Sequence, residues 1–170
     1  MIGLKQVCAM KLEAELYKKK ADIKRLSRGV PETYRIMPDC GGVIKKWVCT
    51  GLNTDMDWVG DSFTFGICYK GKMVGGIILN NYRKDLDVWL TIYSVSPRWC
   101  CKQVLKYTFL MCFKTLECKR VNVLVSKDNH KSLSLCERLG FVKEGLLRQY
   151  REDGKDCYIL GMLKKECKWL

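Results

Sequence analysis

One block of the chain, from Arg120 to Arg148, constrains the fold most because the spacing of its apolar residues changes twice. It opens with alternating β-branched residues, which predict a strand that ends at a polar corner, Lys127 to Asn129. Apolar residues then fall at helical spacing up to Leu139, and Gly140 stands where a left-handed helix cap is favoured. A second strand is predicted to follow at once. The corner of such a unit exposes helix N-terminal N–H groups, which suit a polar or anionic ligand.

This block resembles the GNAT acyl-CoA-dependent N-acyltransferases, and within them the protein N-terminal acetyltransferases of the RimJ/RimL kind. The matching residues are Arg120-Val121, Asn129, Ser132, Leu139-Gly140-Phe141, Glu144-Gly145 and Leu147-Arg148, followed by Asp153-Gly154 and Asp156 at the family's last hairpin. The resemblance covers about residues 63 to 168 and extends to acetyltransferases of bacterial and phage genomes. It implies an acyl-CoA fold but does not by itself imply activity.

The resemblance implies an α/β (α+β) GNAT fold, with a mixed central sheet of about six or seven strands and helices on both faces. The chain would add an N-terminal basic helix, residues 1–30, to an acyltransferase domain, residues 31–170. Apolar residues from Ala9 to Val30 mark one face of that helix, which Gly29 and Pro31 close. The helix is either a partner-binding or dimerisation arm or an extra helix laid against the domain.

Composition limits the function classes. A chain of 170 residues suits one domain. No apolar run is long enough to span a bilayer and no signal-peptide core is seen, so a cytoplasmic protein is expected, in the host cytoplasm if phage-encoded. The eleven cysteines are odd in number and form no Cys-x-x-Cys pair, which indicates reduced thiols rather than disulfides. With one histidine in the chain, no metal site is expected.

The net charge of +13 indicates an attraction to polyanions. Residues 1–30 hold eight positive and three negative side chains, so five units of the excess lie there and eight in the remainder. Coenzyme A is one such anion, and an acidic partner or nucleic acid is another. The alternative is a basic surface without a specific role.

The middle of the chain predicts a hairpin and a crossover. Alternating apolar residues from Phe63 to Tyr69 and from Met73 to Leu79 flank a Lys-Gly-Lys turn, and Asn80 to Asp85 is a second predicted turn. A strand over Val88 to Val95, a helix over Cys100 to Leu116 and the Val121 strand then form a parallel crossover. The carboxyl ends of these two strands would lie together, which is where open α/β sheets bind ligands.

Residues 31–62 are harder to interpret. The segments Tyr34-Arg35-Ile36 and Gly42 to Val48 are compatible with a short helix or a strand, and Thr50 to Gly60 is rich in turn-forming residues. In the family that the chain resembles, this region shapes the acceptor pocket.

The resemblance places the cofactor at the start of the crossover helix. GNAT proteins carry Arg/Gln-x-x-Gly-x-Gly/Ala there, so that backbone N–H groups close on the pyrophosphate. This chain has Cys100, Gln103 and Leu105 at those positions, and Leu105 is expected to crowd the phosphates unless the cofactor sits higher or Lys102 compensates by its charge. The implied cofactor-binding residues are Val95, Ser96, Pro97, Lys102, Gln103, Val104, Leu105, Asn129 and Ser132.

Acetyl transfer also needs a carbonyl donor, an acid and a base. The resemblance assigns the donor to the backbone N–H of Val95 and the pantetheine contact to Asn129. It places Cys136 where many members have a tyrosine acid, although Cys136 also suits the buried side of the helix. No base is identified. The acidic residues Asp55, Asp57, Asp61 and Asp87, together with Tyr93, lie in segments within reach of the pocket.

Two functions remain open. The first is an N-acetyltransferase that moves acetyl from acetyl-CoA to an amine acceptor, either a protein N-terminus or a small molecule, as a monomer or homodimer. The second is a catalytically degenerate GNAT-fold protein that binds an acidic partner or nucleic acid.

Overall fold

The computed structural model describes residues 33–170, so the predicted N-terminal basic helix lies outside the described residues. The strands are β1 (Tyr34–Pro38), β2 (Ser62–Tyr69), β3 (Lys72–Arg83), β4 (Asp87–Ser94), β5 (Arg120–Ser126), β6 (Val142–Leu147) and β7 (Cys157–Leu163). The helices are α3 (Val43–Leu52), α4 (Met56–Val59), α5 (Lys102–Leu110) and α6 (His130–Leu139). Short helical segments are η1 (Pro97–Trp99), the π-helix η2 (Met111–Thr115) and η3 (Lys164–Glu166).

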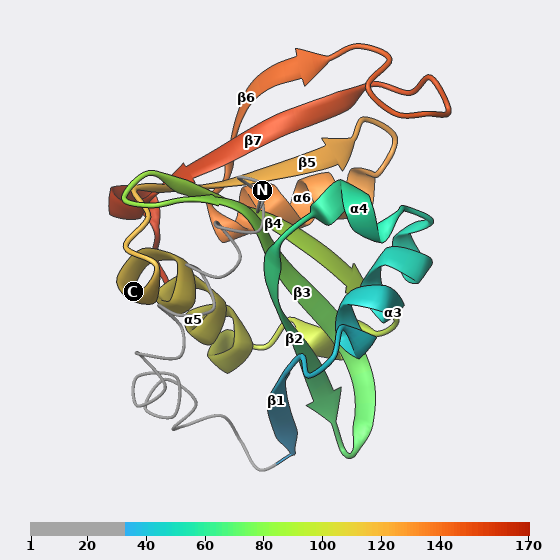
Figure 1. Ribbon diagram of the computed structural model, residues 1–170. Coiled ribbons are helices and arrows are strands. Elements are labelled where there is room, and N and C mark those ends of the chain that lie inside the picture. Colours follow the sequence, from blue (N-terminus) through green and yellow to red (C-terminus); the bar gives the residue numbers. More distant parts are fainter. Residues whose placement is uncertain (1–32) are drawn as a thin grey trace, which may run out of the picture.

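The strands form one mixed sheet in the order β1-β2-β3-β4-β5-β7-β6 (Figure 1). All neighbouring pairs are antiparallel except β4 and β5, which run parallel. Because α5 and η2 connect this parallel pair, the predicted crossover is confirmed.

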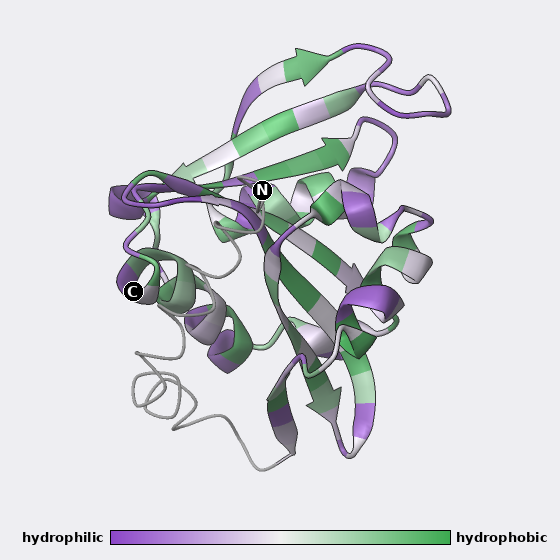
Figure 2. Cartoon of the chain, viewed as in Figure 1, coloured by the Kyte–Doolittle hydropathy of each residue, from purple (hydrophilic) through white to green (hydrophobic). Residues whose placement is uncertain are grey.

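Helices cover both faces of the sheet, as predicted. On one face, side chains of α5, η2 and α6, among them Phe109, Phe113 and Leu133, pack against the inward residues of the strands. On the other face, Val48 of α3 and Val59 of α4 pack against Ile78 of β3. Figure 2 shows the apolar residues concentrated in the central strands and the polar residues in the loop between β6 and β7.

The structure decides one region that the sequence left open and corrects two predicted boundaries. Residues 33–61, for which the sequence left helix and strand open, form strand β1 and helices α3 and α4. The predicted turn at Asn80 to Asp85 is wrong in its first half, because β3 continues to Arg83 and buries Asn80 between strands. The helix predicted over Cys100 to Leu116 begins at Lys102 and changes to a π-helix at Met111.

Two further observations apply to residues 33–170. No helix in this part of the chain combines the length and apolarity needed to cross a membrane. Its cysteines are all free, and only Cys40 among them is fully exposed.

Candidate active site

The strands β4 and β5 separate part of the way along their length. They pair at Asp87 with Arg120, Val88 with Val121 and Trp89 with Asn122, and no further. Beyond that point β4 stays paired with β3 up to Ser94, while β5 stays paired with β7 up to Ser126. Figure 1 shows the arrowheads of β4 and β5 pointing in different directions. We call the region between their carboxyl-terminal halves, where the two backbones are no longer hydrogen-bonded to each other, the β4–β5 gap.

Two backbone N–H groups of β4 point toward this gap. The N–H of Val95 donates to the carbonyl of Val74 at 3.1 Å, so Val95 is bonded to β3. Because successive residues of a strand direct their N–H groups to opposite neighbours, the N–H groups of Ile92 and Ser94 face away from β3 and toward β5. The Val95 N–H, to which the resemblance assigns the thioester carbonyl, is therefore already bonded to Val74, and the N–H groups that face the gap are those of Ile92 and Ser94.

The amino-terminal end of α5 follows the carboxyl end of β4. The first hydrogen bond of the helix runs from Leu105 N to Cys101 O, which leaves the N–H groups of Lys102, Gln103 and Val104 without helical acceptors. Cys101 makes no side-chain capping bond, and the first turn contains no acidic residue. These groups are suited to bind an anion, which a helix N-terminus favours.

The side chains around this end of α5 differ from the sequence expectation. Leu105 is 5% exposed and packs in the core, so it does not point outward to crowd a phosphate. Val104 is also buried, Gln103 is half-buried and Lys102 is exposed. At the second of the two small-residue positions the larger side chain, Leu105, therefore turns into the core, whereas Gln103 at the first position is only half-buried.

The turn between β4 and α5 is held by its own contacts. Ser96 Oγ accepts a hydrogen bond from Arg98 N at 3.3 Å, and Pro97 begins the short helix η1. Trp99 is buried against Gly75 of β3, where an added Cβ would lie 2.7 Å from the Trp99 Cβ. Gly75 is thus needed for Trp99 to anchor this turn to the sheet.

The corner after β5 is capped by its own asparagine. Asn129 Oδ1 accepts a hydrogen bond from Ser132 N at 3.1 Å, so its carbonyl serves as the N-cap of α6. The Nδ2 group of this exposed side chain remains a donor at the end of β5. Ser132 is half-buried, and His130, the first residue of the helix, is exposed.

Cys136 lies on the half-buried side of α6 and packs against the core. Burial, and to a lesser degree the charge of Glu137, raises the pKa of its thiol to about 11. The thiol therefore keeps its proton at neutral pH.

The candidate bases are dispersed. Asp87 is 2% exposed and lies where β4 is still paired with β5, and its carboxylate is taken up by hydrogen bonds from Arg83 and Asn122, so it does not face the gap as a base would. Asp55 Oδ1 accepts a hydrogen bond from Asp57 N at 2.9 Å and caps α4. Tyr93, near the end of β4, contacts the ring of Trp47 edge-on at 4.9 Å.

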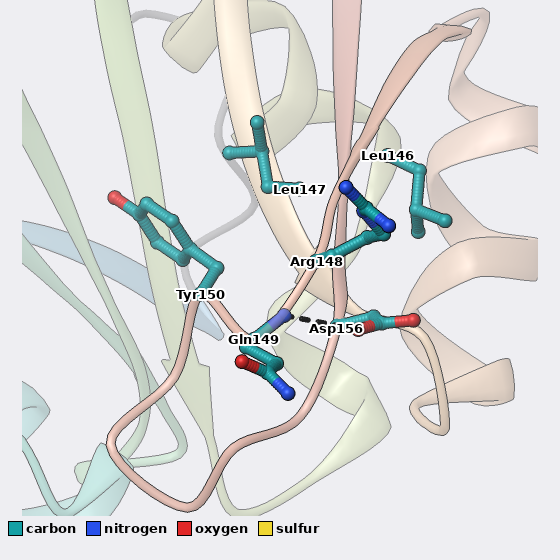
Figure 3. Close-up of a pocket in the computed structure, with 6 residues that line it drawn as sticks. All are labelled: Leu146, Leu147, Arg148, Gln149, Tyr150 and Asp156. Atoms are coloured by element: carbon teal, nitrogen blue, oxygen red, sulfur yellow. Dashed lines mark hydrogen bonds between the residues drawn. The ribbon is translucent and has the colours of Figure 1, made fainter.

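A hollow that the sequence did not predict lies at the hairpin between β6 and β7 (Figure 3). Its volume is about 670 Å³, and its lining residues are Leu146, Leu147, Arg148, Gln149, Tyr150 and Asp156. Asp156 Oδ1 accepts a hydrogen bond from Gln149 N at 3.0 Å, which holds the loop closed. Pairing of Leu147 with Cys157, and of Cys157 with Ser126, places the hollow beside the carboxyl end of β5. Three of its residues, Leu147, Arg148 and Asp156, belong to the pattern that the chain shares with the GNAT family, but that pattern assigned them no site.

The fold is shared with known acetyltransferases. The chain resembles a GNAT family acetyltransferase from Elizabethkingia anophelis with acetyl-CoA bound, with a TM-score of 0.66 and 14% identity over 78% of this chain and 99% of that one. It also resembles a dodecameric spermidine N-acetyltransferase from Vibrio cholerae, with a TM-score of 0.62 and 14% identity over 78% and 95% of the two chains. No protein-family model and no curated protein sequence matches the chain. The residues described therefore have the GNAT fold.

Proposed function

We propose that this chain is an acyl-CoA-dependent N-acetyltransferase that moves the acetyl group of acetyl-CoA to an amine. The observation that carries the proposal is the separation of β4 and β5 after Trp89 and Asn122, with the free N-terminal end of α5 beside it. Similar structures described as acetyltransferases, one of them with acetyl-CoA bound, support it.

The chain offers separate groups for the parts of the cofactor. The free N–H groups of Lys102, Gln103 and Val104, with the Lys102 ammonium, would receive the pyrophosphate. Ser96 and Pro97 shape the approach to this site, and the side chains of Asn129 and Ser132 would bound the pantetheine from the β5 side. Acetyl-CoA supplies a thioester carbonyl that an amine can attack.

The N–H of Ser94, with that of Ile92 deeper in the gap, would donate to the carbonyl oxygen as it gains negative charge. Cys136 is the candidate acid for the departing sulfur. Because the pKa of Cys136 is about 11 and that of an ordinary thiol is about 8.5, this proton transfer is uphill. Cys136→Ala should therefore lower kcat by less than about tenfold.

The acceptor is an amine of a small molecule or of a protein N-terminus. The spermidine N-acetyltransferase among the similar structures makes spermidine the first small amine to test, and a peptide with a free N-terminus is the second. Release of coenzyme A, measured as free thiol in the presence of each amine, distinguishes the two.

Calorimetric titration with acetyl-CoA tests the proposal directly. Lys102→Glu should weaken binding by about tenfold because it places a carboxylate at the helix end that receives the phosphates. Lys106→Glu makes the same charge change about one turn further along the exposed side of α5 and is the matched control. Saturable binding, weakened by the first variant more than the second, supports the proposal; no heat at millimolar acetyl-CoA would end it.

A second candidate is a degenerate GNAT-fold protein that binds nucleic acid or an acidic partner. It is favoured by the net charge of +13 and by Gln103, a long polar side chain at a position where the family carries a glycine. It predicts salt-sensitive nucleic-acid binding that acetyl-CoA does not change and that is lost when residues 1–30 are deleted. Salt-independent or absent binding would exclude it.

A further inference from the structure

A buried polar contact joins β4 to β5 where the two strands are still paired. Asn122 Nδ2 donates a hydrogen bond to Asp87 Oδ2 at 2.8 Å, and these residues are 3% and 2% exposed. Trp89 and Asn122 form the last pair before the strands separate. The contact therefore lies next to the point where the β4–β5 gap begins.

Further hydrogen bonds extend this contact on both sides. Arg83 of β3 donates to the two carboxylate oxygens of Asp87, each at 2.6 Å. Arg120 Nε donates to Asn122 Oδ1 at 2.7 Å, and Arg120 also forms an ion pair with Glu144 of β6. We call these five residues the polar clamp. It links β3 to β4 on one side of the gap and β6 to β5 on the other.

The clamp lies across β7 at a glycine. A Cβ added at Gly161 would lie 2.4 Å from Arg120 Nη2 and 2.6 Å from Glu144 Oε1. Gly161 is paired with both Asn122 and Val142, so it lies directly between the strands that carry these side chains. Because Gly161 has no side chain, the Arg120 guanidinium and the Glu144 carboxylate can lie directly over it.

We infer that the polar clamp sets the angle at which β4 and β5 diverge, and that Asp87 and Asn122 are positioning residues for the thioester site. The inference rests on the proposed function, since the N–H donors of Ile92 and Ser94 lie on the part of β4 that the clamp would orient. None of the five clamp residues is among those proposed above to hold the cofactor.

A small rotation of β4 at the clamp produces a larger displacement at the far end of the strand. Ser94 is seven residues beyond Asp87, or roughly 23 Å along an extended strand. A rotation of about 5° at the clamp would therefore move the Ser94 N–H by roughly 2 Å relative to β5. Misplacement by about 1 Å can cost about 100-fold in rate. A small change at the clamp should thus affect the site more than it affects the rest of the fold.

The test compares one disruptive variant with an exchanged pair. Asn122→Asp places a second carboxylate against Asp87, which forces the strands apart at the clamp. The double variant Asp87→Asn/Asn122→Asp exchanges the two groups, so that an amide again faces a carboxylate and each keeps an arginine beside it. Tyr82→Phe is the control, because it removes a hydrogen bond from β3 to Leu116 O that lies outside the clamp.

Calorimetry with acetyl-CoA and thermal melting should be measured on all four proteins. Because β4 leads through η1 into α5, the same shift would move the phosphate-binding N–H groups relative to Asn129, so we expect the dissociation constant to rise by about tenfold or more in Asn122→Asp and to return to within about threefold in the double variant. Tyr82→Phe should lower the melting temperature while changing the dissociation constant by less than about twofold. Equal effects of Asn122→Asp and Tyr82→Phe on binding, or a double variant that is not restored, would overturn the inference.

Hydrogen-exchange mass spectrometry separates this inference from the proposed function, because it needs no cofactor. Peptides covering residues 86–95 and 119–126 should exchange faster in Asn122→Asp, and at the wild-type rate in the double variant. That pattern in a protein that binds no acetyl-CoA would support the clamp and refute the acetyltransferase. Unchanged exchange in Asn122→Asp would refute the clamp whatever acetyl-CoA does.

Discussion

Gly51, on the exposed surface of α3, is predicted to resist a substitution that usually stabilises helices. Replacing a helical glycine with alanine gains about 0.5–1 kcal/mol because alanine loses less backbone entropy. Here the new Cβ would lie 2.2 Å from Cε1 of Tyr93 and 2.3 Å from its Cζ. The ring already contacts Trp47 edge-on at 4.9 Å, so it cannot move toward Trp47 freely.

Crowding of this kind costs about 1–3 kcal/mol. The crowding outweighs the helix gain, and Gly51→Ala should lower the free energy of unfolding by about 1–2 kcal/mol, or the melting temperature by roughly 3–6 °C in a domain of this size. Urea denaturation followed by tryptophan fluorescence would measure the difference.

The effect of Gly51→Ala on the free energy of unfolding should change sign when Tyr93 is also replaced. In a protein that already carries Tyr93→Leu, the ring is absent and Gly51→Ala should raise the free energy of unfolding by about 0.5–1 kcal/mol. If Gly51→Ala stabilises the protein with Tyr93 intact, or has the same sign in both backgrounds, α3 does not pack on β4 through this contact.

Three further outcomes are expected. Ser94→Pro removes an N–H that faces the gap without breaking the ladder to β3, so it should lower kcat by about 100-fold with a small change in melting temperature; a kcat within tenfold of wild type would contradict the assignment. Burial alone would raise the pKa of Asp87, but hydrogen bonds from Arg83 and Asn122 and the charges of Arg83 and Arg120 lower it. The contribution of Asp87 to the free energy of unfolding is therefore complete above its unfolded pKa of about 3.9 and is lost as the pH falls through its lower, folded pKa. In Asp87→Asn, the melting temperature should therefore fall less steeply as the pH is lowered through this range. Cys40 should react with a thiol reagent well before Cys136, whose pKa is about 11, and mass spectrometry after brief labelling at neutral pH would show any other order.

Local patterns predicted the second half of the chain well. The strand, capped helix and glycine of the Arg120 to Arg148 block appear as β5, α6 and Gly140, whose φ of 108° is left-handed. These features could be found because spacing and capping depend on neighbours in the sequence.

Other features depend on residues far apart in the chain. Asp87 and Asn122 are separated by 35 positions, so nothing local showed that they share a hydrogen bond. The burial of Leu105 likewise depends on which way α5 turns against the sheet. Asn122, a polar residue in the middle of a β-branched strand, was the one sequence signal that a buried polar partner existed.

The bond from Val95 to Val74 limits which insertions and deletions β4 can accept during evolution. Since the orientation of each amide along β4 depends on whether its position is odd or even, inserting or deleting one residue before the end of that strand would exchange the groups presented to the thioester. The same change would also move each side chain of the strand end to the opposite face of the sheet, so both the amides and the side chains at the site would be exchanged. In this protein, the number of residues in β4 matters as much as their chemical identity.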